Sequence, residues 1–288
     1  MSFDLPYAFS YGRPSSNSLF LSPKWSDAAA MTASSEQGLL AVEHVQRMDP
    51  TQVWRATGCA AEWLAWDFGE AVIADAAIIV AHNLSPTAML RLRLAGTAAD
   101  VAAAPAIDSG AVSAWPTSGK PSLSDWPAWL SLVRATNPLA YRYGRLDIAD
   151  PGNPAGYVEI GRLIAGPAFV PEINVDVSPS LGLLTPDEAG RTPFGRAYGD
   201  NRGPAARTLQ LPMSAIDEDE MGSQLFELKR YCGLARDFAF CLDPAATSRF
   251  HRYSGQFRFG ALAPFQARPF WNAANQVWQT TLPLEEVL

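Results

Sequence analysis

The sequence is poor in the residues that build disulfide and metal sites. It contains three cysteines, an odd number with no metal-ligand spacing, and three histidines that lie far apart along its 288 residues. A disulfide framework or a structural zinc site needs several such residues at short, regular spacings. We therefore expect buried free thiols in a protein that matures in a reducing cytoplasm, and no bound metal or cofactor.

Positive charge and long apolar runs are also scarce. The formal net charge is −7, and acidic residues outnumber basic ones in both halves of the chain. Proteins that bind the phosphate backbone carry a basic surface, so this composition argues against nucleic-acid recognition. No uncharged apolar run approaches the ~18 residues that a membrane-spanning helix needs. The first residues lack a basic and apolar signal peptide, and we expect no membrane insertion.

Common catalytic motifs are absent as well. The sequence has no Gly-x-Ser-x-Gly elbow, no His-Glu-x-x-His pair and no glycine-rich phosphate loop. A glycosidase needs two carboxylates across a cleft, and the second half shows no obvious pair. We expect a protein that is not an enzyme. A glycan-active enzyme with an accessory binding module remains a competing hypothesis, which an absence of turnover on a glycan panel would exclude.

Alternating apolar and polar residues predict strands in the first half. Residues 62–68 (E-W-L-A-W-D-F) alternate strictly, with the large apolar side chains Leu64, Trp66 and Phe68 on one face. Gly69 and Glu70 interrupt this pattern, and the apolar run 76–81 predicts a second, antiparallel strand. Residues 89–95 alternate again.

A further hairpin is predicted over residues 146–164. Residues 141–148 and 157–164 alternate on either side of the turn Asp-Pro-Gly-Asn-Pro-Ala-Gly at 150–156. Asp147, Asp150 and Asn153 surround this turn and could supply oxygens to one cation, although turn chemistry alone explains them.

The second half mixes strands with one helix. Asp217 to Glu220 precede apolar residues at helical spacing, and Lys229 and Arg230 lie near the far end, which predicts a helix over 217–231. The EF-hand spacing is absent, so the acidic run is interpreted as a helix start. The glycine- and proline-rich segment 178–203 is predicted to be a long loop. Strands are predicted at residues 207–211, 237–242, 251–260 and 276–284.

Three tryptophans are the candidate binding residues. Trp115, Trp126 and Trp129 lie in a loop-rich stretch, and exposed tryptophans on the loops of a β scaffold commonly stack on sugar rings. The structural alternative is that they plug one end of a sandwich or make a subunit contact. For His82 and His251 a structural role within the fold is preferred to a site role.

The first half resembles a known family. Residues 53–56 (V-W-R-A), residues 62–69 (ending in D-F-G) and the apolar strand 76–83 resemble a discoidin-type, galactose-binding-like jelly roll. Residues 156–163 with Gly166 and Pro167 resemble the closing strands of the versions carried by tailed-bacteriophage structural proteins. The resemblance implies an N-terminal jelly-roll sandwich, with an N-terminal arm, over residues 1–172.

The second half resembles tail-tip modules of siphophages. The helix at 217–231, the strand and loop at 237–244, and the last strand with Trp278 are similar to tail-tube-like sandwich domains of distal tail proteins. Many distal tail proteins have their ring-forming domain first, whereas here it would come second. The resemblance implies a mainly β protein whose C-terminal part, residues 173–288, is a β-sandwich or α+β domain with one packed helix.

Taken together, the resemblances imply a structural component of a phage tail tip or baseplate. It would form a homo-oligomeric ring, with a hexamer expected, and dock other baseplate or receptor-binding proteins. It would be assembled in the host bacterial cytoplasm and reside in the virion. The segment 178–203 and the N-terminal arm are candidate contacts between neighbours. The alternative is a carbohydrate-binding adhesin that recognises a host surface glycan, which alanine substitution of each tryptophan would test.

Overall fold

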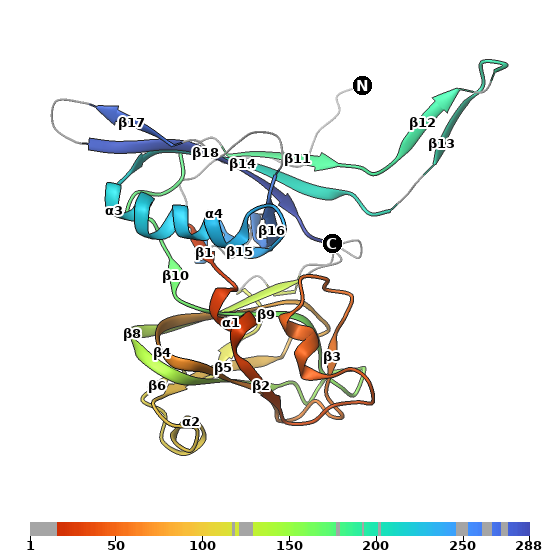
Figure 1. The fold of residues 1–288 in the computed structure, drawn as a ribbon. Coiled ribbons are helices and arrows are strands. Elements are labelled where there is room, and N and C mark those ends of the chain that lie inside the picture. The colour runs from red at the N-terminus through yellow and green to blue at the C-terminus, as the bar shows by residue number, and fades with distance from the viewer. Residues whose placement is uncertain are drawn as a thin grey trace, which may run out of the picture.

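The computed structural model describes residues 16–116, 119–120, 129–176, 179–191, 193–200, 203–245, 253–260, 267–271 and 276–288. Over these residues the protein is mainly β, and the predicted fold class is confirmed. Two antiparallel sheets of eight strands each form two bodies, and a separate two-stranded ribbon extends from one of them (Figure 1). No helix among the described residues is both long enough and apolar enough to cross a membrane.

The first sheet forms a jelly-roll sandwich. Its strand order is β3-β9-β4-β8-β5-β6, with β2 added to β4 and β7 added to β5. Leu64, Trp66 and Phe68 are buried in its core, as their alternation predicts. The bounds of its strands are β2 (Ala30–Ala33), β3 (Trp54–Arg55), β4 (Glu62–His82), β5 (Met89–Ala95), β6 (Ile107–Asp108), β7 (Val112–Ser113), β8 (Leu130–Ala149) and β9 (Glu159–Gly166). Three short helical turns accompany them: α1 (Lys24–Ala28), the 3-10 turn η1 (Val42–Gln46) and α2 (Asp100–Ala103).

The predicted break at Gly69 and Glu70 is wrong, because residues 62–82 form one continuous strand. The register of β4 against β8 shifts between Asp67 and Val72, and Gly69 has a φ of 81° within this irregularity. Such a bulge bends a strand without ending it. The apolar run after the bulge is buried on both faces, because alternate residues belong to the jelly-roll core and to a cluster shared with the second body. This two-sided burial explains why the run does not alternate.

The predicted hairpin over residues 146–164 is also wrong. β8 and β9 do not pair with each other, because β4 lies between them: Ile78 is opposite Leu132 on one side and Ile164 on the other. Each alternating segment was correctly identified as a strand. Alternation indicates which face of a strand is buried, but it does not say which strand lies beside it.

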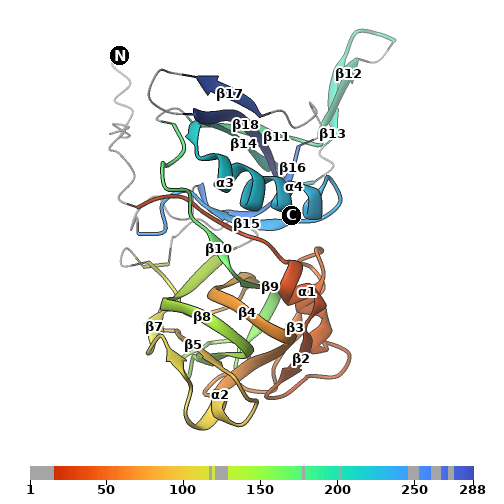
Figure 2. The same ribbon diagram turned by 60° about the vertical axis from the view of Figure 1, so that its left-hand side comes forward.

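The second sheet carries the predicted helix. Its strand order is β10-β1-β15-β16-β18-β14-β11, with β17 added to β18. A continuous helical segment packs on it (Figure 2), and the prediction over 217–231 is confirmed. Asp217 caps this segment by accepting a hydrogen bond from the amide of Asp219 at 2.9 Å. The bounds are β1 (Leu19–Leu21), β10 (Ala168–Phe169), β11 (Ser180–Leu184), β14 (Ala206–Ile216), α3 (Glu218–Glu220), the π-helical turn η2 (Met221–Leu225), α4 (Phe226–Cys232), β15 (Phe238–Cys241), β16 (Gly255–Phe259), β17 (Arg268–Trp271) and β18 (Gln276–Glu286).

Two short strands from the first part of the chain belong to the second sheet. β1 pairs with β15 on one side and with β10 on the other. The chain therefore passes between the two bodies twice, once from β1 into α1 and once from β9 into β10. The predicted boundary at residue 172 follows β10. Of the predicted N-terminal arm, residues 1–15 lie outside the described residues.

The segment 178–203 contains strands where a loop was predicted. β11 pairs with β14, and beyond them β12 (Glu188–Arg191) and β13 (Ala197–Asp200) form a ribbon that projects from the body (Figures 1 and 2). We call residues 180–200 the arm. Gly190 lies opposite Tyr198, and a Cβ atom at Gly190 would come within 2.9 Å of the tyrosine ring. The glycine therefore leaves room for an aromatic ring across the strands, a role that single-sequence turn rules do not anticipate.

Candidate functional site

The predicted tryptophan site is only partly on the surface. Trp115 is 3% exposed, and its indole nitrogen donates to the carbonyl of Ser85 at 2.7 Å. Its ring meets the rings of Trp129 and His82 edge-on, with centroids 5.6 and 5.2 Å apart. This is the packing of a plug at one end of the sandwich. Trp129 is half-buried, and Trp126 lies outside the described residues. Sugar binding at this end remains a prediction.

His82 has the structural role expected for it. The side chain is buried at the end of β4, where Nδ1 accepts from the amide of Leu84 at 3.4 Å and Nε2 lies 2.9 Å from the hydroxyl of Ser131. These contacts fix the strand end to the following turn. His251 lies outside the described residues.

The carboxylates around the turn 150–156 are satisfied by protein donors. Asp150 is fully buried and accepts from the amide and hydroxyl of Ser85 and, at 2.9 Å, from the side-chain amide of Asn153. Asp147 is paired with Arg93 and Arg145. Within the part of the chain that the structure describes, no group of three or more histidine, cysteine or acidic side chains could hold a metal ion. Turn chemistry accounts for these residues.

A polar and aromatic cluster at the same end of the jelly roll was missed from the sequence. The guanidinium of Arg55 lies 4.3 Å above the ring of Tyr157 and 3.2 Å from the carboxylate of Glu159, and all three side chains are half-buried. The side chain of Asn83 donates to the carbonyl of Tyr157 and so connects the cluster to the end of β4. An aromatic face beside hydrogen-bonding charges can recognise a polar ring. The only sign of this cluster in the sequence was the alternation of residues 157–164, which predicts a strand.

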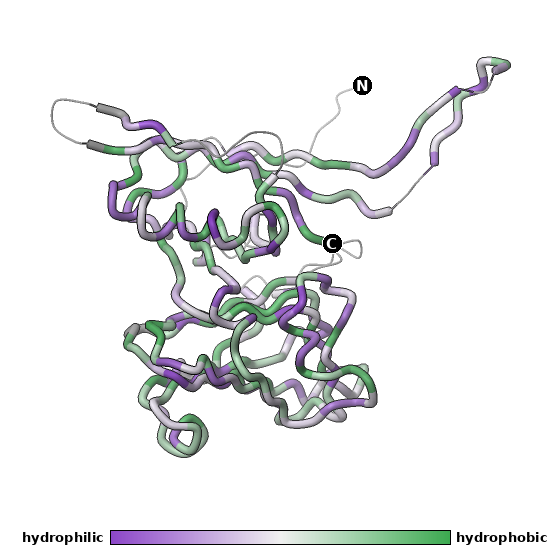
Figure 3. The backbone as a smooth tube through the Cα atoms, viewed as in Figure 1, coloured by the Kyte–Doolittle hydropathy of each residue, from purple (hydrophilic) through white to green (hydrophobic). Residues whose placement is uncertain are grey.

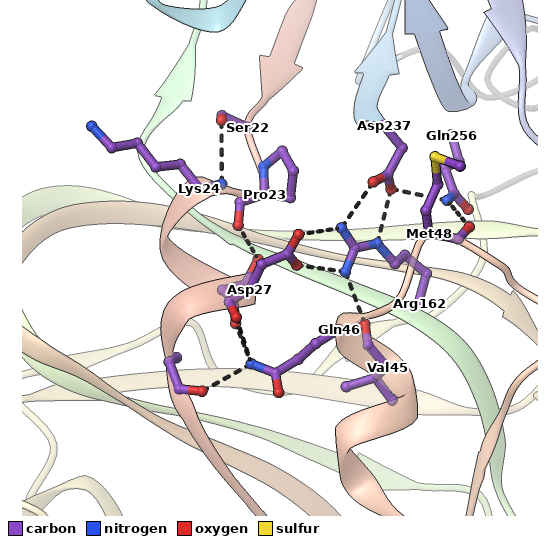
Figure 4. Close-up of polar contacts among 12 residues, drawn as sticks. Ser22, Pro23, Lys24, Asp27, Val45, Gln46, Met48, Arg162, Asp237 and Gln256 are labelled. Atoms are coloured by element: carbon purple, nitrogen blue, oxygen red, sulfur yellow. Dashed lines mark hydrogen bonds and ion pairs between the residues drawn. The ribbon is translucent and has the colours of Figure 1, made fainter. Parts of the chain in front are cut away.

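A buried charge network joins the two bodies (Figure 4). Arg162 of β9 is fully buried and donates to Asp27 of α1 at 2.6 and 3.0 Å and to Asp237, just before β15, at 2.8 and 3.0 Å. Gln256 of β16 donates to Asp237 at 2.9 Å and to the carbonyl of Met48 at 2.7 Å. One arginine therefore holds carboxylates from both bodies.

The electrostatics of this network favour a charged Arg162. Burial alone lowers the pKa of Arg162, but the carboxylates of Asp237 and Asp27 raise it above its ordinary value. Burial raises the pKa of Asp27, and the hydrogen bonds from Arg162 oppose this shift only in part. With both carboxylates bound by Arg162, the network is suited to hold the bodies together.

A cavity of about 200 Å³ lies between the two bodies. Its apolar lining comes from Phe20, Phe169 and Leu228, which are buried, and the half-buried rings of Trp25 and Tyr231 flank them. Polar side chains from α1 and from the helical segment complete the lining: Ser22, Lys24, Ser223, Gln224 and Glu227.

The arm exposes large apolar side chains at the edge of the second sheet and on the ribbon beyond it. Figure 3 shows apolar segments along it. Leu183 is 70% exposed and Phe194, in the turn between β12 and β13, is 97% exposed. The remaining members of this set are Leu181, Leu184 and Tyr198.

Comparisons with known proteins give similar solved structures but no matching family. No protein-family model and no curated protein matches the sequence. Among solved structures, the chain is similar to a chitosan-binding module of a chitosanase/glucanase from Paenibacillus sp. IK-5, with 12% identity, 49% of this chain and 96% of that chain covered, and a TM-score of 0.34. It is also similar to the family 32 CBM of C. perfringens NanJ in complex with galactose (12%, 52% and 99%, TM-score 0.35).

A third similar structure is the lectin domain of lectinolysin complexed with Lewis B antigen. Its identity is 10%, the match covers 48% of this chain and 91% of that one, and the TM-score is 0.32. At such values the function must be inferred from this chain's own residues.

Proposed function

We propose that this protein is a non-enzymatic structural subunit that assembles with copies of itself. The arm carries this proposal. A two-stranded ribbon is marginally stable in water by itself, and monomeric proteins rarely expose adjoining large apolar side chains outside an interaction site. Phe194 is exposed on such a ribbon, and Leu183 and Leu184 are exposed on β11, the edge strand of the second sheet that leads into it. A neighbouring subunit would cover these side chains and stabilise the arm.

The position of the arm favours a ring or filament. It projects from one side of the second body (Figures 1 and 2), and its tip can reach a surface on a neighbour that differs from the arm itself. Such heterologous contacts close into rings or continue as helical filaments. The sequence resemblance supports the finer proposal of a phage tail tip or baseplate. There the subunit would form a ring, expected to be hexameric, with its jelly roll docking other virion proteins, after assembly in the host bacterial cytoplasm.

Mass in solution tests the proposal. We expect light scattering to give a ring-sized mass that rises with protein concentration. A variant in which a short Gly-Ser turn replaces residues 188–200 should be monomeric with unchanged thermal unfolding. Leu39→Ser is the matched control, since Leu39 is 91% exposed but lies in the first body. A full chain that stays monomeric at high concentration and never enters particles would contradict the proposal.

The jelly roll offers a second candidate function, which is glycan binding. The half-buried Trp129 and the cluster of Arg55, Tyr157 and Glu159 flank the same end of β4. The similar solved modules are described as chitosan-binding or as complexes with galactose and Lewis B antigen.

Binding of galactose, chitosan oligomers and Lewis B to immobilised protein would test this second function. Tyr157→Ala and Trp129→Ala should each weaken binding about tenfold or more, because one stacking aromatic is typically worth ~1–3 kcal/mol. Tyr198→Ala on the arm is the control. Equal binding by all variants, or no binding by the wild type, would contradict a glycan site at this end.

A further inference from the structure

We propose that Phe194 at the tip of the arm inserts into the cavity between the two bodies of a second copy. This inference rests on the proposed self-assembly and specifies its contact. Both views place the arm tip and the cavity-bearing elements α1 and α4 in separate parts of the molecule (Figures 1 and 2). An arm therefore docks on a neighbour, and each copy contributes one arm and one cavity.

The tip of the arm has the form of an anchor. Phe194 is 97% exposed and lies in the turn that joins β12 to β13. The paired strands hold this turn away from the body, so little conformational freedom is lost when the ring is buried. Arg191 and Arg196 lie on either side of Phe194 in sequence, and both are exposed. The tip therefore presents one apolar ring between two cations.

The cavity suits this anchor in size and in lining. An apolar cavity of about 150 Å³ can hold a benzene ring, and the cavity here measures about 200 Å³. Its apolar surface comes from Phe20, Phe169 and Leu228, beside the rings of Trp25 and Tyr231. Aromatic rings pack well edge-to-face against one another. A phenyl group is thus a better match for this lining than a charged or strongly hydrated ligand.

Charged side chains of both signs lie at the rim of the cavity. Glu227 lines the cavity and is exposed, and the helical segment that carries it begins with the exposed residues Glu218 and Asp219. Lys24 is a cation on the opposite side of the rim, and Arg230 pairs with Glu227 at 2.8 Å. Glu227 is therefore the acidic residue at the rim, and an arginine of an incoming tip would share its carboxylate with Arg230. Such a contact would contribute to the orientation of docking.

Two single variants and their mixture test this contact. Phe194→Ala removes the anchor but keeps the cavity, whereas Gln224→Trp crowds the cavity and keeps the arm. Each variant alone should associate at least ~30-fold more weakly than the wild type, the effect expected for an interface hot spot. A one-to-one mixture should form heterodimers and no larger species, because only one arm and one cavity remain usable. Gln224→Ala is the control and should assemble normally.

A charge exchange gives an independent result. Glu227→Arg should weaken association, and combining it with Arg191→Glu and Arg196→Glu should restore part of the loss. If the wild type assembles but Gln224→Trp assembles equally well, the arm docks elsewhere and this inference is overturned while self-assembly stands. If the wild type never assembles, the proposed function fails before the contact is tested. Circular dichroism on every variant shows that a loss of association is not a loss of folding.

Discussion

The two bodies of the molecule differ in the large apolar residues that they leave exposed. In the jelly roll, Trp54, Trp66 and Trp115 are buried, and the exposed apolar side chains, such as Leu39 and Ile73, are scattered. In the second body, the arm carries Leu183 and Phe194 into solvent. These three tryptophans therefore belong to the core, while the less conspicuous arm carries the exposed apolar side chains on which the proposed self-assembly rests.

The region between the bodies, which we call the junction, differs from both bodies because it combines apolar packing with a buried charge. An apolar cluster that includes Leu21, Ile78 and Cys241 lies beside the fully buried charge of Arg162. A buried ion pair contributes little net stability compared with apolar packing, but the loss of one partner is costly. Arg162 therefore serves to fix the arrangement of the bodies. Substitutions at the junction, in the jelly-roll core and on the arm test these differences.

The largest effect is expected at the junction. Arg162→Ala would leave the carboxylates of Asp27 and Asp237 without their cation and should cost ~3–5 kcal/mol of unfolding free energy. Arg230→Ala is the control, since its pair with Glu227 is exposed and should contribute less than ~0.5 kcal/mol. Urea unfolding followed by circular dichroism measures both. Equal losses would show that the network does not hold the bodies.

The loss of stability in Arg162→Ala should depend on pH. Burial already raises the pKa of Asp27 in the folded protein, and removing Arg162 removes the opposing hydrogen bonds. A carboxyl whose folded pKa is raised contributes stability below its unfolded pKa, and this contribution is lost as the pH rises through the folded pKa. The defect of Arg162→Ala should therefore be smaller near pH 4 than near pH 8. A constant defect would contradict this account.

A pair of leucines compares the core with the arm. Leu92→Ala in β5 removes a fully buried side chain and should cost ~2–5 kcal/mol, because a cavity remains. Leu183→Ala on the arm should change the stability of the monomer by less than ~0.5 kcal/mol. Thermal unfolding of both variants gives the comparison. A large loss for Leu183→Ala would mean that the arm is covered within its own chain.

Two glycines also compare the jelly-roll core with the arm, with smaller expected effects on stability. A Cβ atom at Gly144 would lie 2.3 Å from the ring of Trp66, so Gly144→Ala should cost ~1–3 kcal/mol and alter tryptophan fluorescence. A Cβ atom at Gly199 on the arm would meet nothing within 4 Å. Gly199→Ala should leave the unfolding midpoint unchanged. Similar shifts in the two variants would contradict the assigned packing of Trp66.

The smallest effect belongs to a surface ion pair of the jelly roll. Hydrogen bonds from Arg91 lower the pKa of Asp108 to about 2, from an ordinary value of 3.8. A depressed carboxyl pKa contributes stability above the unfolded value that is lost as the pH falls towards 2. Arg91→Ala should cost less than ~1 kcal/mol at pH 7, and this cost should shrink as the pH falls through 2. NMR titration of Asp108 would show its pKa return towards 3.8, and an unchanged value would contradict the assignment.

Local sequence patterns predicted which residues form strands or helices and which face of each is buried. They did not predict which strands lie side by side. The alternation of residues 89–95 matches β5 (Met89–Ala95), and the acidic start at Asp217 marks the helix correctly. β4 was divided at Gly69 because a bulge and a strand end look alike in one sequence. The strands of the arm were missed because the fit of Gly190 beneath Tyr198 exists only once the two strands pair.

The candidate sites were harder to predict because they join distant residues. Arg55 and Glu159 are 104 positions apart, and Arg162 is 135 positions from Asp27. Trp115 looked like a loop aromatic, yet its ring is part of the core. Composition and spacing gave no sign of the cavity between the bodies, because its lining comes from three separated segments.

The position of β1 sets the order in which the chain can finish folding. Its partner β15 lies near the other end of the sequence, and Ser16 and Asp243, which hydrogen-bond beside this pair, are 227 positions apart. During synthesis the jelly-roll strands emerge together and can form early, whereas β1 must wait for β15. Contacts of such long range are slow to form. Pairing of β1 with β15 therefore joins the second sheet and closes the junction in one step, which can follow only after β15 has been made.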